Sequence, residues 1–148
     1  MACGEEILQE DGEIDRKKLG EVVFSEPGQL DRLNEIMHPR MARMVSDKSE
    51  VLRGQGVGVV VVEAALLFEA GWDSLVEDVW VTDSPEELVI DRAKKRNGMS
   101  EEEARKRISS QMDRSDRLER SDAVIDNSGD MAGLERVIKE LWDRRVAV

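Results

Sequence analysis

The chain has 148 residues, of which 40% are hydrophobic and 37% are charged, a composition typical of one soluble globular domain with its own core. The net charge of −11 argues against general nucleic-acid binding, which needs a basic surface to displace counterions from phosphates. No stretch approaches the roughly 18 apolar residues that span a membrane, and the N-terminus is too acidic for a signal peptide. The single cysteine, Cys3, excludes an internal disulfide framework. We therefore expect a cytoplasmic protein without membrane partners.

The first third of the chain has a helical pattern. The sequence "SEPG" at 25–28 separates a short helix from a longer one. In the longer helix apolar residues recur at spacings of three and four, as on one face of an amphipathic helix: Leu30, Leu33, Ile36, Met37, Met41, Met44 and Val45. His38-Pro39 interrupts this stripe, so we expect a kink or a break there.

Three apolar runs are predicted to be strands. The run "VGVVVV" at 57–62 is rich in β-branched residues and is preceded by glycines, which is typical of a central strand in a parallel sheet. The runs "DVWVTD" at 78–83 and "DAVIDN" at 122–127 are shorter. Strands that alternate with helices predict a parallel α/β sheet.

Helices are predicted between and after these strands. Pro85 opens one that runs to about Arg96, with Gly98 at its C-cap. Ser100 and Glu103 form a capping box for a second helix, which we expect to extend through Gln111. The last helix has a clear apolar face: Leu134, Val137, Ile138, Leu141 and Trp142.

Glu63, Asp83 and Asn127 all follow predicted strands. In parallel α/β sheets the ligand crevice lies at the carboxyl ends of the strands, so an acid there either contacts a ligand or caps the next helix. Residues 91–120 hold ten basic and seven acidic side chains in an otherwise acidic protein. This segment is either a site for a small polyanion such as a nucleotide or a solvated helix pair of mixed charge.

Four stretches are similar to motifs of the dephospho-CoA kinase family. They are "EEILQEDGEIDRKKLGEVVFSEPGQLDRLNEIMHP" at 5–39, "VVVVEAALLFEAGW" at 59–72, "DRAKKRNGMSEEEARKRISSQM" at 91–112 and "SDAVIDNSG" at 121–129. The stretches follow the family's order with near-family spacings, so the chain resembles this family over essentially its whole length.

The resemblance implies a parallel-sheet P-loop kinase core with a helical CoA-binding insertion and a mobile helical lid. We expect the insertion at 5–53, the core at 57–90 and 121–148, and the lid at 91–120. The family phosphorylates the ribose 3′-hydroxyl of dephospho-CoA with Mg-ATP, the last step of coenzyme A synthesis. The implied ligands are ATP, Mg²⁺ and dephospho-CoA, and the chemistry rests on positioning and charge neutralisation.

The resemblance assigns a phosphate clamp to Arg92 and Arg96 in the lid. The two lie one helical turn apart, so both guanidiniums can face one phosphate cluster, unless they belong to a solvated face paired with acids. Arg107 and Gln111 are expected on one face of the next helix, with Gln111 a substrate-binding residue. Where the family commonly has glutamine, three residues before the first arginine, this chain has Val89.

Two acids follow the predicted central strand. Glu63 matches a family acid that holds the water shell of Mg²⁺ or orients the substrate. The family usually has aspartate there and proline two residues later, whereas this chain has Glu63 and Ala65. Glu69 is interpreted as an anchor for its loop or as a functional acid.

Three other residues are candidate ligand contacts. His38 matches a histidine at the floor of the family's CoA site, and it either contacts the substrate or anchors the helix break. Asn127 and Gly129 match residues beside the adenine of ATP, although Asn-Ser-Gly is also ordinary turn chemistry.

The family's phosphate-binding motif has no match in this sequence. The family begins with a strand, a "GxxGxGKS" loop and an aspartate that acts as general base, and Met1 corresponds to a point after all three. The glycines at 53–58 precede a strand and lack Lys-Ser, so they cannot substitute. In the family the missing first strand lies between those matching 58–62 and 78–82, and we expect these two to collapse together, pair with another chain or stay partly disordered.

We therefore expect a dephospho-CoA kinase that is inactive as this truncated chain. The alternative is a non-catalytic module that binds CoA or dephospho-CoA, or that complements a separate P-loop fragment, with self-association through the vacant strand position. A kinase of the nucleoside monophosphate type fits the lid but not the sequence at 5–39.

Overall fold

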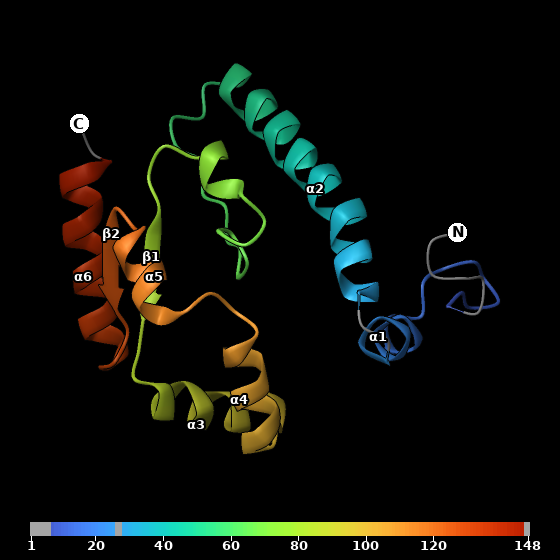
Figure 1. Cartoon of the computed structure of the whole chain (residues 1–148). Helices are drawn as coiled ribbons and strands as arrows, with labels where there is room; N and C mark the ends of the chain where they lie inside the picture. The colour runs from blue at the N-terminus through green and yellow to red at the C-terminus, as the bar shows by residue number, and fades with distance from the viewer. Residues whose placement is uncertain (1–6, 26–27, 147–148) are drawn as a thin grey trace. The chain divides into compact units, whose positions relative to one another are not determined.

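The computed structural model describes residues 7–25 and 28–146 and divides the chain into two compact units, Met1–Val60 and Val61–Val148. Among these residues no helix is both long and apolar enough to cross a membrane. Unit 1 holds the helices α1 (Arg16–Ser25) and α2 (Gln29–Gly54). Unit 2 holds the other elements (Figure 1): the 3₁₀ helix η1 (Trp72–Leu75), β1 (Trp80–Asp83), α3 (Glu86–Asn97), α4 (Glu101–Ser109), α5 (Arg114–Glu119), β2 (Ala123–Asp126) and α6 (Met131–Arg145).

The two predicted N-terminal helices are confirmed. A side-chain oxygen of Asp15 accepts the backbone amides of Lys17 and Lys18 at 3.0 and 3.1 Å, which caps the start of α1. Gly28 has a φ of 85° directly before α2, a conformation that glycine adopts without steric cost. The predicted interruption at 25–28 is thus present between α1 and α2, although 26–27 lie outside the described residues.

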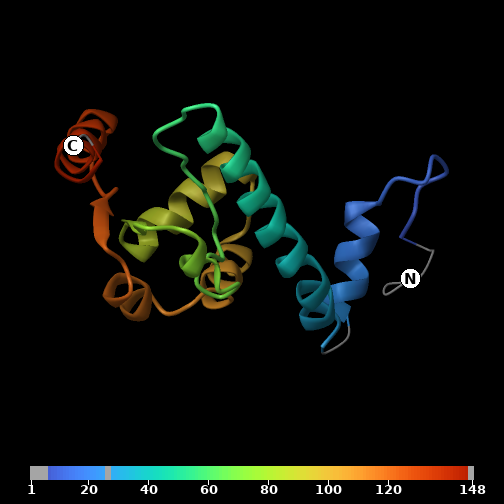
Figure 2. The same cartoon turned by 90° about the horizontal axis from the view of Figure 1, so that it is seen from above.

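Of the kink or break predicted at His38-Pro39, the break does not occur. Helix α2 runs without interruption from Gln29 to Gly54 with Pro39 in its interior (Figure 2). Proline removes one intrahelical hydrogen bond, but strong helix formers such as Met41 and Ala42 follow it and propagate the helix. The apolar stripe of α2 remains largely uncovered: no residue of this helix is buried, and Met44 is 61% exposed.

The predicted central strand at 57–62 does not form. Residues 57–64 have no regular secondary structure, and Val59, Val60 and Val61 are 42%, 38% and 78% exposed. The amide of Val57 donates to the carbonyl of Leu52 at 3.1 Å, whereas the amides of 58–62 have no backbone partner among the described residues. A strand is stable only when a neighbour completes its hydrogen-bond ladder, and this segment has none.

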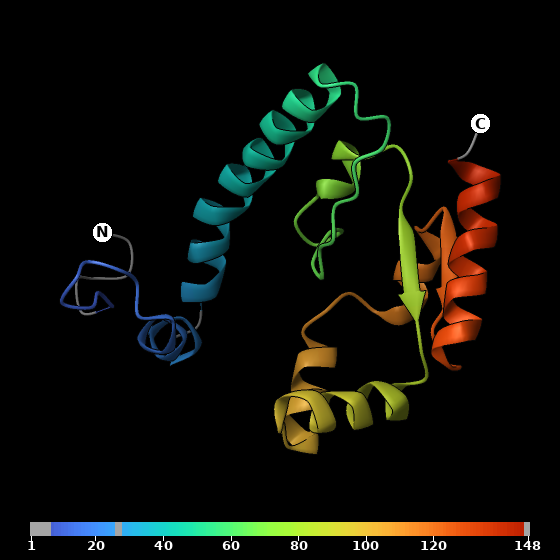
Figure 3. The same ribbon diagram turned by 180° about the vertical axis from the view of Figure 1, so that it is seen from behind.

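The other two predicted strands form a parallel sheet with two members, β1 and β2, in which Trp80 pairs with Ala123 and Asp83 with Asp126. Helix α6 covers the sheet (Figure 3), and the core lies between them. It consists of three buried residues and three half-buried neighbours: Ala123, Ile125, Leu141, Trp80, Leu134 and Val137. The α/β class, the parallel pairing and the last helix are therefore confirmed.

The predicted helix boundaries between the strands are mostly correct. Gly98, with a φ of 65°, ends α3, and Ser100 and Glu103 form the predicted capping box at the start of α4. Helix α4, however, ends at Ser109, so Gln111 lies beyond it and does not share a helix face with Arg107. Helix α5 was not predicted; Asp113 caps it by accepting the amide of Ser115 at 2.8 Å.

Candidate functional site

The carboxyl ends of β1 and β2 bring together two residues that the sequence placed in the site, Arg92 and Asn127. The parallel ladder continues one step beyond the strands, because the amide of Asn127 donates to the carbonyl of Asp83 at 2.8 Å. The carbonyl oxygen of Asn127 then accepts Arg92 Nη1 at 2.8 Å and Ser84 Oγ at 2.9 Å. Arg92 Nη1 also lies 3.3 Å from Ser84 Oγ. A half-buried arginine of α3 is thus fixed directly to the strand exits.

Asp83, the last residue of β1, carries the best-defined ion pair of this region. Arg114 Nε donates to Oδ1 at 2.7 Å and Nη2 to Oδ2 at 2.5 Å, a two-pronged geometry that suits guanidinium and carboxylate. The Asp83 side chain is 19% exposed. The hydrogen bonds from Arg114 hold the pKa of Asp83 below its usual value, against the opposing effect of burial.

Asp126, the register partner of Asp83, is the second carboxylate at the strand exits. Its Oδ1 accepts the amide of Ser128 at 2.8 Å, and hydrogen bonds from Ser128 lower the pKa of Asp126. Both carboxylates are therefore ionised at neutral pH, and only Asp83 has an arginine across from it. The loop from Asp126 to Gly129 is shaped by this local bond, which matches the turn chemistry predicted for Asn-Ser-Gly.

The segment after α4 is held by side chains from residues 68–73. Glu69 accepts the backbone amide of Met112 at 2.6 Å, so it anchors the segment after α4, whereas the predicted anchor was for its own loop. Arg120 of α5 pairs with Asp73 at 2.8 Å, and its guanidinium carbon lies 4.4 Å from the centroid of the Phe68 ring. Together with the Arg114 pair, these contacts fix α5 to β1 and to residues 68–73.

Gln111 already has a protein partner, since its Oε1 accepts Arg117 Nη1 at 2.8 Å. This oxygen can accept one further hydrogen bond, and the side-chain NH₂ group can donate to a ligand. The role predicted for Gln111 therefore remains a proposal, and the structure supplies a different one: it ties the segment before α5 to α5 itself.

The remaining predicted residues lie outside this cluster of contacts. Arg96 is exposed in the last turn of α3, and Gly129 is exposed just before Asp130, which caps α6. Glu63 is exposed and does not follow a strand, contrary to the prediction. His38 lies in α2 of unit 1.

In the described part of the chain, no group of three or more His, Cys, Asp or Glu side chains is arranged to hold a metal ion. The described residues therefore offer no Ca²⁺ or Zn²⁺ site built wholly from protein side chains.

Comparison with known proteins identifies the family. Residues 1–133 match the family model described as Dephospho-CoA kinase. The chain belongs to the dephospho-CoA kinase family. It is 41% identical over 144 residues to the dephospho-CoA kinase of Geobacter sulfurreducens, with 97% of this chain and 73% of that protein covered. It is 42% identical over 141 residues to the dephospho-CoA kinase of Corynebacterium diphtheriae, with 95% and 70% covered.

Solved structures give the same assignment for this dephospho-CoA kinase family member. A crystal structure of a Thermus thermophilus protein matches with a TM-score of 0.78 and 30% identity, over 95% of this chain and 72% of that one. The structure of the dephospho-CoA kinase from Campylobacter jejuni matches with a TM-score of 0.65 and 30% identity, over 95% and 71%. The predicted resemblance and the kinase fold are confirmed, and the family implies a transferase that uses ATP.

Proposed function

We propose that this chain supplies the substrate-binding and lid parts of a kinase that transfers the γ-phosphoryl group of ATP to the ribose 3′-hydroxyl of dephospho-CoA. The observation that carries the proposal is the contact of Arg92 with Ser84 and Asn127. This contact fixes a cationic side chain at the carboxyl ends of two parallel strands, where α/β proteins bind their ligands.

The clamp residues act by neutralising charge. Arg92 uses Nη1 for the strand exit, and Nε and Nη2 have no hydrogen bond to the described residues, so they can donate to a phosphate. Arg96 follows one turn later on α3. Guanidiniums aimed at the transferring phosphoryl group stabilise charge that grows in the transition state, which raises kcat more than it lowers KM.

The other site residues divide between the two ligands. Asn127 and Gly129 are proposed to lie on the nucleotide side, and His38, Glu63 and Gln111 on the dephospho-CoA side. Mg²⁺, when bound with ATP, neutralises charge on the phosphates. Glu63 is a candidate to hold one of its waters, since carboxylates near this ion commonly act through its water shell.

The 148 residues contain no Gly-x-x-x-x-Gly-Lys-Ser/Thr motif. In P-loop kinases the backbone amides and lysine of this motif hold the β- and γ-phosphates, and the described residues offer no comparable loop. We therefore propose that this polypeptide alone does not turn over ATP, and that a P-loop and aspartate segment joined ahead of Met1 restores the activity.

The test is ADP release from Mg-ATP by the purified chain, with and without dephospho-CoA, before and after fusion to a family P-loop and aspartate segment. We expect dephospho-CoA-dependent turnover from the fusion alone. In the fusion, R92A/R96A should lower kcat by about 10²- to 10³-fold. The matched control is K94A/K95A, which removes two exposed charges from the same helix and should change kcat less than twofold, about the scale of a lost surface pair. Turnover by the unfused chain would overturn the proposed inactivity.

The irregular segment at 57–62 favours a second candidate function, a fragment that pairs with another chain. Three exposed valines and unpaired amides are suited to strand addition, either by a separate P-loop fragment or by a second copy. Light scattering after size-exclusion chromatography tests self-association: a dimer that V59K/V61K converts to a monomer supports it, and a monomer at all concentrations excludes it.

A further inference from the structure

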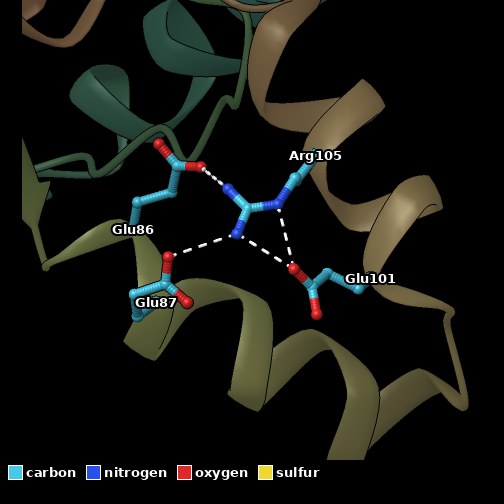
Figure 4. A network of polar contacts seen from close by, with 4 residues as sticks. All are labelled: Glu86, Glu87, Glu101 and Arg105. Atoms are coloured by element: carbon cyan, nitrogen blue, oxygen red, sulfur yellow. Dashed lines mark hydrogen bonds and ion pairs between the residues drawn. The ribbon is translucent and has the colours of Figure 1, made fainter.

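Arg105 is the centre of an ion-pair network that joins α3 and α4 (Figure 4). Its Nη1 lies 2.5 Å from Glu86 Oε1, and its Nη2 lies 3.2 Å from Glu87 Oε1. Both of these acids are in the first turn of α3. Nε and Nη2 also contact Glu101 Oε1, within α4, at 3.1 and 3.0 Å. One guanidinium therefore connects three carboxylates from two helices.

The network and the connecting turn join α3 and α4 at opposite ends of the helical hairpin. At one end of the hairpin the chain itself joins the helices, through the left-handed Gly98 and the capping box of Ser100 and Glu103. At the other end Arg105, in the second turn of α4, reaches the first turn of α3. The hairpin is thus closed covalently at one end and ionically at the other.

Few apolar contacts hold the two helices together. Ile90 in α3 and Ala104 in α4 are their only buried residues among those described, at 3% and 2% exposure. The other ion pairs recorded here, Lys95 with Asp91 and Lys106 with Glu102, each lie within one helix. Arg105 therefore supplies a charged link between the helices.

Charge balance makes this link sensitive to a single substitution. Three carboxylates face one guanidinium, so the network keeps two excess negative charges even when Arg105 is present. Without Arg105, Glu101 of α4 would repel Glu86 and Glu87 of α3 with nothing between them. By comparison, loss of Lys106 removes the ion-pair partner of a single exposed acid, Glu102, in the same helix.

We propose that Arg105 is a positioning residue of the lid: its ion pairs with Glu86 and Glu87 hold α3 and α4 as one rigid body. The consequence for the reaction rests on the function proposed above. The clamp residues Arg92 and Arg96 lie on α3, so fixing α3 to α4 limits the movement of the helix that carries them. Arg105 itself is engaged by carboxylates and leaves phosphate binding to Arg92 and Arg96.

Hydrogen exchange on the 148-residue chain tests the rigid pair without any assay of activity. In R105A we expect amides of α4 and of the first turn of α3 to exchange about two- to fivefold faster, the scale of lost surface ion pairs, with β2 and α6 unchanged. The matched control K106A removes an equal charge from the adjacent position and should leave α3 unchanged. The charge exchange R105E/E86R should restore the slow exchange that R105E alone loses.

Equal exchange in R105A and K106A, or no recovery in R105E/E86R, would overturn the proposal.

Activity of the P-loop fusion then separates positioning from direct binding. R105A should lower kcat about five- to tenfold with KM for ATP within twofold, as expected when only transition-state alignment is lost. A large rise in KM for ATP in R105A without faster amide hydrogen exchange would instead indicate that Arg105 binds a phosphate directly. A fusion that is inactive even without substitutions would refute the proposed function and leave the exchange result standing.

Discussion

Asp83 shows how one side chain can connect a strand exit to a helix that follows much later in the chain. It ends β1, its backbone carbonyl accepts the amide of Asn127, and its carboxylate receives both prongs of Arg114 from α5. The backbone contact extends the sheet, and the side-chain contact fixes α5. Because Arg114 lowers the pKa of Asp83, this connection contributes to stability in a pH-dependent way.

We predict that D83N lowers the thermal midpoint by about 3 °C at pH 7, a shift typical of a good ion pair in a domain of this size. The folded pKa of Asp83 lies below its unfolded value, so the contribution is complete above about pH 4 and is lost as the pH falls through the folded pKa. Thermal melts of both proteins between pH 2 and pH 7 should converge at the acid end.

The control for this prediction is D91N, which removes an acid from an exposed pair with Lys95 inside α3. It should shift the midpoint by less than about 1 °C. A gap between D83N and the unsubstituted chain that is equally large at pH 2 and pH 7 would show that the carboxylate charge is not what stabilises this site.

The roles of single residues were predicted correctly where those roles depend on hydrogen bonds to residues nearby in sequence. The Ser100 and Glu103 capping box and the turn at Asn127 were found because their hydrogen bonds span two or three residues. The family resemblance selected Arg92 and Asn127, and the structure places them in contact across 35 positions. The pair of Asp83 with Arg114 was missed, because nothing local relates two residues 31 positions apart.

At the scale of elements, helices were easier to predict than strands. A helix satisfies its own backbone groups, so periodicity and caps located α3 nearly to the residue. They also indicated α2 and α6, although α2 continues through the predicted interruption at His38-Pro39. The short helix α5 lacks such periodicity and was missed. The valine run at 57–62 has high strand propensity, yet strand formation depends on a partner that propensity does not describe.

The turn between α3 and α4 gives an element-scale prediction. Gly98 has a φ of 65°, so G98A forces a side chain into the left-handed region and should destabilise the hairpin by about 1 kcal/mol. The comparison is G20A, at an interior position of α1 with open space for a methyl group, which should stabilise its helix by about 0.5–1 kcal/mol.

Hydrogen exchange in α3 and helical circular dichroism measure these two changes separately. The last turn of α3 should exchange faster in G98A, and helical content should rise in G20A. If G98A left the exchange of α3 unchanged, the left-handed cap would not be what ends this helix.

At the scale of the whole molecule, the described sheet has two strands, β1 and β2. β1 has β2 as its neighbour, and the chain that was expected to form a further strand stays irregular and exposed. In such a segment the backbone amides are hydrogen-bonded by water, so their exposure costs little free energy. The exposed valines, however, do not contribute the free energy that burial in a core would give. The sequence pattern at 57–62 is therefore consistent with a partner strand rather than with solvent.

Supplying that strand should order the segment. In the 148-residue chain we predict that amides of 58–62 exchange at rates close to those of an unstructured peptide, because they lack backbone partners among the described residues. In the P-loop fusion the added strand can lie between 58–62 and β1, so these amides should slow by at least about tenfold, as in a paired strand. Amides of β2 already donate to β1 and should change far less.

If the amides of 58–62 still exchanged fast while the fusion was active, the kinase would work without this strand in its sheet, and the valine run would need another partner. If they slowed without any gain in activity, the strand would be paired as predicted while the proposed kinase function would be refuted.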